Sequence, residues 1–122
     1  MFEGIITPIV TPFNRDKEES INYEATEKLI NYLIEHGVKG IFILGSNGEF
    51  HVVDEDEKVE FAKKVVEIVN KRVPVFVGTG CCSTRATVRL SKKMEKIGAD
   101  ALSVITPYFL KPTDENLYAH YK

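Results

Sequence analysis

The segment from Gly45 to Glu49, with the sequence GSNGE, has residue types that can bind a small anion. Glycine lets a ligand approach the backbone closely, and Ser46 and Asn47 offer hydroxyl, amide and backbone hydrogen-bond donors. The segment directly follows an apolar run at residues 40–44, so these donors would lie at the end of a buried strand. An ordinary tight turn uses the same residue types. The segment alone therefore leaves two interpretations open, a ligand-binding loop and a simple turn.

The elements that would position this segment are four apolar, β-rich runs. Their starts are separated by about thirty residues, which is the length of one strand plus one helix. The runs are apolar at successive positions rather than at alternate ones, as is typical of strands buried on both faces of a parallel sheet. The predicted strands lie at residues 5–10, 40–44, 73–77 and 101–105.

Each predicted strand is followed by an amphipathic helical pattern with residues that favour a defined helix start. The predicted N-caps are Asn22, Asp54, Ser83 and Thr113. Glu57 lies three residues after Asp54, in the spacing of a capping box. Gly37 and Gly98 are predicted to end the first and third helices.

The resulting strand–helix order, repeated four times, is compatible with two architectures. Right-handed crossovers allow either a small open sheet or half of an eight-stranded barrel. In both, ligands bind at the carboxyl ends of the strands, here residues 11–13, 45–49, 78–81 and 106–109. All four ends are rich in glycine, proline or hydroxyl residues. A receiver-type open sheet would carry acidic residues just after the first strand and an Asp at the end of the third. Here the first strand leads to TPFNRD and the third ends in GTG, which excludes that fold.

Composition narrows the classes of function. The 122 residues have a formal net charge of −2 with 43% hydrophobic and 28% charged residues, which predicts a single folded domain over residues 1–122. No basic stripe indicates a nucleic-acid partner, and no apolar run is long enough to span a membrane. The N-terminal MFEGIITPIV lacks the positive region of a signal peptide, which favours a cytoplasmic location. Adjacent Cys81 and Cys82, without a neighbouring His, predict no metal site.

Several segments together resemble the dihydrodipicolinate synthase and N-acetylneuraminate lyase family, the pyruvate-dependent class I aldolases. The resemblance extends along the whole chain, and the combination of GSNGE with TPYFLKPT is its most specific part. The matching segments are residues 2–4, 10–13, 45–49, 74–80, 106–113 and 115–121.

The resemblance implies a (β/α)8 TIM barrel, of which this chain would cover about the first four βα units. It also implies an enzyme that forms a Schiff base with pyruvate or a related 2-oxo acid and makes or breaks a carbon–carbon bond. Ser46 and Asn47 match the family residues that hold the carboxylate of the 2-oxo acid, and Ser46 also matches a member of a proton relay. The resemblance further implies a homo-oligomer or a companion half-barrel, and no separate cofactor.

Two departures from the family pattern qualify this expectation. The synthases carry two tyrosines after the fourth strand, the second of which crosses a dimer interface to complete the relay; here the pair is Tyr108 and Phe109. Phe109 has no hydroxyl. Tyr108 could substitute as a catalytic residue, and the alternative is that it packs at a subunit interface. The imine-forming lysine belongs to the sixth strand of the family barrel and is expected beyond Lys122.

Three functions follow as alternatives. The first is a lyase or aldolase acting on a 2-oxo acid, with this chain lacking the catalytic lysine. The second is dihydrodipicolinate synthase itself, an enzyme of lysine biosynthesis. The third, of another class, is a non-catalytic half-barrel or fragment that acts as an assembly partner for a companion half-barrel.

Overall fold

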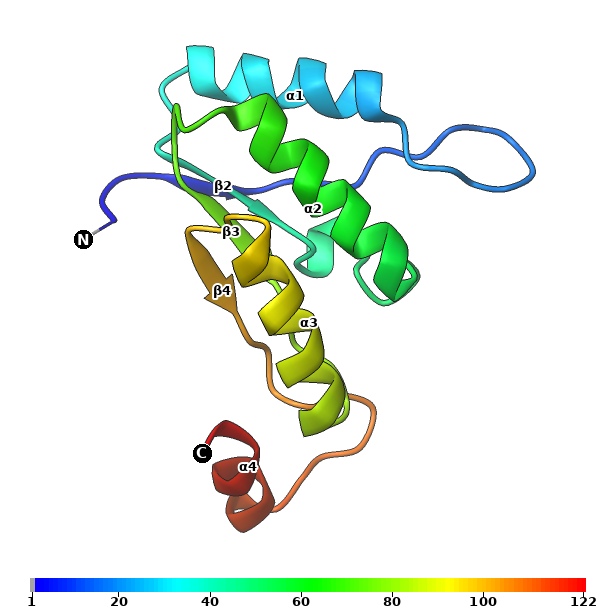
Figure 1. Ribbon diagram of the computed structural model, residues 1–122, viewed down its shortest axis with the longest axis vertical. Helices are drawn as coiled ribbons and strands as arrows, with labels where there is room; N and C mark the ends of the chain where they lie inside the picture. Colours follow the sequence, from blue (N-terminus) through cyan, green and yellow to red (C-terminus); the bar gives the residue numbers. More distant parts are fainter. Residues whose placement is uncertain (1) are drawn as a thin grey trace.

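The computed structural model describes residues 2–122 and contains one four-stranded parallel sheet (Figure 1). The parallel pairing confirms the prediction, and the strand order is β1-β2-β3-β4. The strands are β1 (Ile6–Pro8), β2 (Gly40–Ile43), β3 (Val75–Gly78) and β4 (Ala101–Ser103). They are mostly shorter than the predicted runs. β2 stops before Leu44 because that residue has a φ of 56° and leaves the extended conformation.

Four helices follow the strands in turn: α1 (Tyr23–Glu35), α2 (Glu55–Val69), α3 (Thr84–Lys96) and α4 (Asp114–Tyr121). All four predicted N-caps are confirmed. Asn22, Ser83 and Thr113 each accept a hydrogen bond from a backbone N–H of the first turn, and Asp54 and Glu57 form the predicted capping box. Gly37 and Gly98 have φ values of 89° and 90°, which glycine adopts without a steric penalty.

The hydrophobic core lies between the sheet and the first three helices, which cover the same face of the sheet (Figure 1). Alternate strand residues such as Ile41, Ile43 and Val77 are fully buried there. Phe42 and Phe76, one position along their strands, are only half-buried because they point to the opposite face. The side chains that complete the core are Ile30, Phe61, Val65, Leu90 and Met94.

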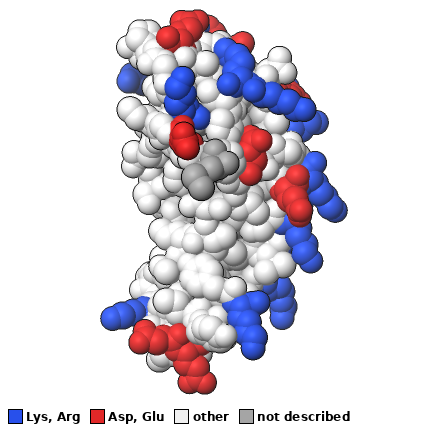
Figure 2. All heavy atoms as spheres, turned by 90° about the vertical axis from the view of Figure 1, so that its left-hand side faces the viewer, with Lys and Arg blue, Asp and Glu red and all other residues white. Residues whose placement is uncertain are grey.

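The opposite face and the two outer strands are less well covered. Neither β1 nor β4 has a second neighbouring strand among residues 2–122. Ile5 beside β1 is 72% exposed, and Ile105 just after β4 is 44% exposed. Figure 2 shows a broad uncharged area in the middle of one face, with charged side chains towards its ends and along one flank. No helix in the described part of the chain is long and apolar enough to cross a membrane.

An ion cluster joins α2 to α3 on the outer surface. Arg89 Nε donates to the Glu55 carboxylate at 2.9 Å, and Lys93 Nζ lies 2.8 Å from the same group. The hydrogen bonds from Arg89 and then Lys93 hold the pKa of Glu55 at about 2. Because this pKa is lowered on folding, the stabilisation is complete above the ordinary glutamate pKa and is lost as the pH falls towards 2.

Glu55→Gln is expected to lower the free energy of unfolding by about 1 kcal/mol at pH 7, since the cluster is partly exposed and screened by solvent. The deficit should shrink as the pH falls from about 4 towards 2, because Glu55 of the unfolded wild-type chain then binds a proton that the folded chain binds only near pH 2. Urea denaturation at several pH values measures it. Asp56→Asn is the matched control, because Asp56 lies in the same helical turn but is 3.5 Å from Lys93 and almost fully exposed. Equal losses in both variants would contradict this account.

Candidate functional site

The GSNGE segment forms a short turn at the carboxyl end of β2. Ser46–Gly48 make one turn of 3-10 helix, closed by hydrogen bonds from Gly48 N to Gly45 O at 3.0 Å and from Glu49 N to Ser46 O at 3.1 Å. Ser46 and Asn47 are exposed. Within residues 2–122, no protein group accepts a hydrogen bond from the backbone N–H of either residue. Two backbone donors and a hydroxyl are therefore available to a ligand.

Thr11, three residues after β1, makes a hydrogen bond that helps to hold this turn in place. Its hydroxyl is buried and donates to the Gly48 carbonyl oxygen at 2.7 Å. A Cβ atom on Gly48 would lie 3.2 Å from the Thr11 hydroxyl and 3.3 Å from the Ile9 carbonyl oxygen, so glycine fits there without displacing either group. Sequence reasoning placed Thr11 at a strand end but assigned it no role. The signal that could have found it is a hydroxyl residue ending the strand next to a glycine-rich turn.

A hollow of about 240 Å³ opens beside the turn, at the carboxyl ends of β2, β3 and β4. Ser46 lines it, whereas Asn47 does not. Its walls are mainly apolar or glycine, and Ser103 adds a second hydroxyl that sequence reasoning did not single out. The remaining lining residues are Phe42, Leu44, Gly45, Phe50, Gly78, Gly80 and Ile105.

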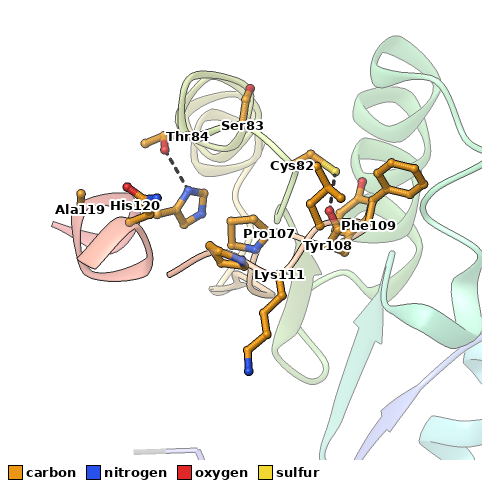
Figure 3. Close-up of a pocket in the computed structure, with 12 residues that line it drawn as sticks. Cys82, Ser83, Thr84, Pro107, Tyr108, Phe109, Lys111, Ala119 and His120 are labelled. Carbon is orange, nitrogen blue, oxygen red and sulfur yellow. Dashed lines mark hydrogen bonds between the residues drawn. The ribbon is translucent and has the colours of Figure 1, made fainter. Parts of the chain in front are cut away.

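Tyr108 lies in a neighbouring hollow of about 640 Å³, which it shares with Cys82, Lys111 and His120 (Figure 3). Its ring packs edge-on against Phe50, with ring centroids 5.4 Å apart. Phe50 also lines the Ser46 hollow, so this side chain links the two. Partial burial, with a contribution from the Cys82 thiol, raises the pKa of the Tyr108 phenol.

Three contacts tie the segment that carries Tyr108 to the rest of the molecule. Cys82 Sγ donates to the Tyr108 carbonyl oxygen at 3.4 Å, and the Tyr121 hydroxyl donates to the Val104 carbonyl oxygen at 3.0 Å. His120 Nδ1 lies 2.9 Å from the Thr84 hydroxyl, which connects α4 to the start of α3 (Figure 3). These contacts anchor the backbone around Tyr108 and the α4 helix that follows it.

The residue after Tyr108 is unusually placed. Phe109 is 95% exposed and has a φ of 76°, a conformation disfavoured for a residue with a side chain. Leu110 beside it is 75% exposed. The two residues therefore form a neighbouring pair of apolar side chains at the surface.

The lysines of this chain lack the surroundings of a nucleophile. None of the lysines in residues 2–122 is buried, and the two whose pKa shifts, Lys28 and Lys93, have it raised by hydrogen bonds to carboxylates. A lysine nucleophile instead needs a pKa lowered by burial. The same residues contain no group of three His, Cys, Asp or Glu side chains that could hold a metal ion.

The model of the dihydrodipicolinate synthetase family matches residues 1–122. The chain belongs to this family. It is 45% identical over 122 residues to a 4-hydroxy-tetrahydrodipicolinate synthase of Thermotoga maritima, and 46% identical to that of Thermodesulfovibrio yellowstonii. These matches take in the whole chain but only 40% and 41% of the two relatives. The chain thus spans about 40% of the length of the curated relatives it matches.

Solved structures of family members superpose on the chain over nearly all of its length. The Acinetobacter baumannii dihydrodipicolinate synthase complexed with pyruvate gives a TM-score of 0.93 at 38% identity, over 99% of this chain and 41% of that one. YagE of Escherichia coli K12, also in complex with pyruvate, gives a TM-score of 0.93 at 38% identity, over 99% of this chain and 40% of YagE. The predicted TIM-barrel family is thereby confirmed, with this chain forming about four βα units, and the small open sheet is excluded.

Proposed function

We propose that this chain provides the carboxylate-binding part of a Schiff-base lyase that acts on pyruvate or a related 2-oxo acid. The observation that carries the proposal is the Ser46–Gly48 turn, whose free N–H groups and hydroxyl lie at the carboxyl ends of parallel strands. Family members bind pyruvate in solved structures, which supports the same substrate class here.

The chemistry divides between binding and proton transfer. The N–H groups of Ser46 and Asn47 bind the substrate carboxylate without a buried arginine. An imine between the 2-oxo carbon and a lysine then draws electrons from the neighbouring carbon, so that a carbon–carbon bond forms or breaks. We assign this lysine to a part of the barrel beyond these 122 residues. The Ser46 hydroxyl carries the proton, with no separate cofactor. Tyr108 is the second relay candidate, although Phe50 lies between its hollow and that of Ser46.

Two further functions remain as alternatives. The names of the relatives favour dihydrodipicolinate synthase itself, while Phe109 lacks the hydroxyl that the synthases use in the relay. The uncovered sheet face favours a half-barrel that assembles with a companion chain. In either case the exposed Phe109 and Leu110 support a homo-oligomer or another close partner.

The experiment that tests this function is imine trapping in a chimaera. The 122 residues replace the segment they match in the Thermotoga maritima synthase, which restores a complete barrel. Incubation with pyruvate and borohydride should add one reduced pyruvate to a lysine of the chimaera, seen by mass spectrometry after digestion. The isolated 122-residue chain should gain no adduct, because none of its described lysines is buried. A folded chimaera without an adduct would refute the proposal.

A further inference from the structure

Leu44, the residue that leads from β2 into the turn, has a backbone conformation unusual for its type. Its φ is 56°, in the left-handed region, where the Cβ atom of an L-residue crowds its own backbone. Its side chain is 1% exposed, so the residue is also held in the core. Glu49, at the other end of the turn, has a φ of 51°. Backbone strain of this kind concentrates at ligand sites, where the surrounding structure maintains it.

Gly78, at the end of β3, makes room for this conformation. A Cβ atom on Gly78 would lie 2.0 Å from the carbonyl oxygen of Leu44, 2.8 Å from its carbonyl carbon and 3.4 Å from Gly45 N. Backbone atoms cannot yield to such a contact as a flexible side chain can. The peptide that joins Leu44 to Gly45 can therefore occupy this position only because residue 78 has no side chain.

We propose that Leu44 and Gly78 form a backbone latch that orients the Ser46 and Asn47 N–H groups towards the ligand. Leu44 is a positioning residue in this scheme. It contacts none of the reacting atoms and acts only through the conformation of the turn that follows it. The inference rests on the proposed function only for the identity of the ligand, a 2-oxo acid carboxylate. The latch itself is a property of this chain and can be tested without catalysis.

Packing and backbone roles of Leu44 can be separated by two substitutions of nearly conserved volume. Leu44→Met keeps an unbranched Cβ and fills a similar space, so the left-handed conformation is retained. Leu44→Ile keeps the volume but adds a branch at Cβ, which makes a positive φ much less favourable. Gly78→Ala tests the same contact from β3, because the added Cβ atom would clash with the Leu44 carbonyl group. Ile43→Met is the control for a core change, because Ile43 is equally buried but lies in the extended strand.

The test compares backbone amide resonances of the turn in ¹⁵N-labelled chains. Leu44→Ile and Gly78→Ala should shift the Ser46, Asn47 and Gly48 resonances, whereas Leu44→Met and Ile43→Met should leave them close to wild type. In the Thermotoga chimaera, Leu44→Ile should raise the KM for pyruvate about tenfold relative to Leu44→Met, since a small misplacement of binding groups is costly.

Each outcome supports or overturns the latch. Equal resonance shifts in the Ile and Met variants would overturn it, as would a displaced turn with an unchanged KM for pyruvate. If the wild-type chimaera forms no imine, the proposed function fails, and the resonances alone then decide whether the latch exists. If Gly78→Ala does not fold, the Ile and Met pair at position 44 still distinguishes a backbone role from a packing role.

Discussion

Ser46→Ala in the Thermotoga chimaera is expected to lower kcat with pyruvate about 100-fold, the size of a lost general acid–base step. The KM for pyruvate should change little, because the variant keeps the backbone N–H groups of the turn, which have no acceptor within the described residues. An interaction made only in the transition state lowers kcat and kcat/KM equally. Ser46→Thr, which retains a hydroxyl, should recover most of the rate.

Asn47→Ala gives the complementary control. Asn47 is exposed and does not line the Ser46 hollow. Its amide side chain has no hydroxyl for the relay, and its role in the proposal is a polar contact with the substrate. Loss of a contact of about 1 kcal/mol should raise the KM for pyruvate roughly fivefold with kcat nearly unchanged. Steady-state kinetics separates the two variants. Wild-type kinetics in both would reduce the GSNGE segment to an ordinary turn.

The second large effect is expected on association. The sheet of the 122-residue chain has two outer strands without a second neighbour and a face that no helix covers, so copies of the chain should associate in solution. Ile105→Lys places a charge just after β4, beside Phe42 on the uncovered side, where Ile105 is 44% exposed, and should abolish association. Sedimentation velocity over a range of concentrations measures it.

Val88→Lys is the matched control for this charge. Val88 is 46% exposed but lies on α3, on the helical side of the molecule, so the variant should associate like the wild type. The C-terminal portion of the Thermotoga synthase, added separately, should compete with self-association because it presents the missing strands. A wild-type chain that stays monomeric without any companion would contradict the prediction.

The elements of the fold could be predicted because each leaves a local signal. The capping residues and the glycines with positive φ are read directly from residue type, and continuous apolar runs indicate buried parallel strands. Strand ends were less accurate, since they depend on tertiary contacts. Leu44 is apolar and follows β2 directly, yet it leaves the strand with a φ of 56°. This conformation requires space for the Leu44 carbonyl group, which Gly78 provides from 34 positions further along the chain.

The candidate site was predictable in kind but not in detail. The GSNGE sequence indicates the hydrogen-bond donors of Ser46 and Asn47. The left-handed conformations of Leu44 and Glu49 could not be predicted, because leucine and glutamate seldom adopt them, unlike glycine or asparagine. The bond from Thr11 to Gly48 joins residues 37 apart and requires the register of β1 on β2. The position of Tyr108, separated from the Ser46 hollow by Phe50, likewise depends on packing between distant segments.

The central claim is that the Ser46–Gly48 turn holds the carboxylate of a 2-oxo acid. The measurement that tests it most directly is a crystal structure of the chimaera with the borohydride-trapped pyruvate. The carboxylate should accept hydrogen bonds from the backbone N–H groups of Ser46 and Asn47, with the Ser46 hydroxyl beside the former 2-oxo carbon. A trapped adduct whose carboxylate lies away from this turn, bound by other groups, would contradict the claim.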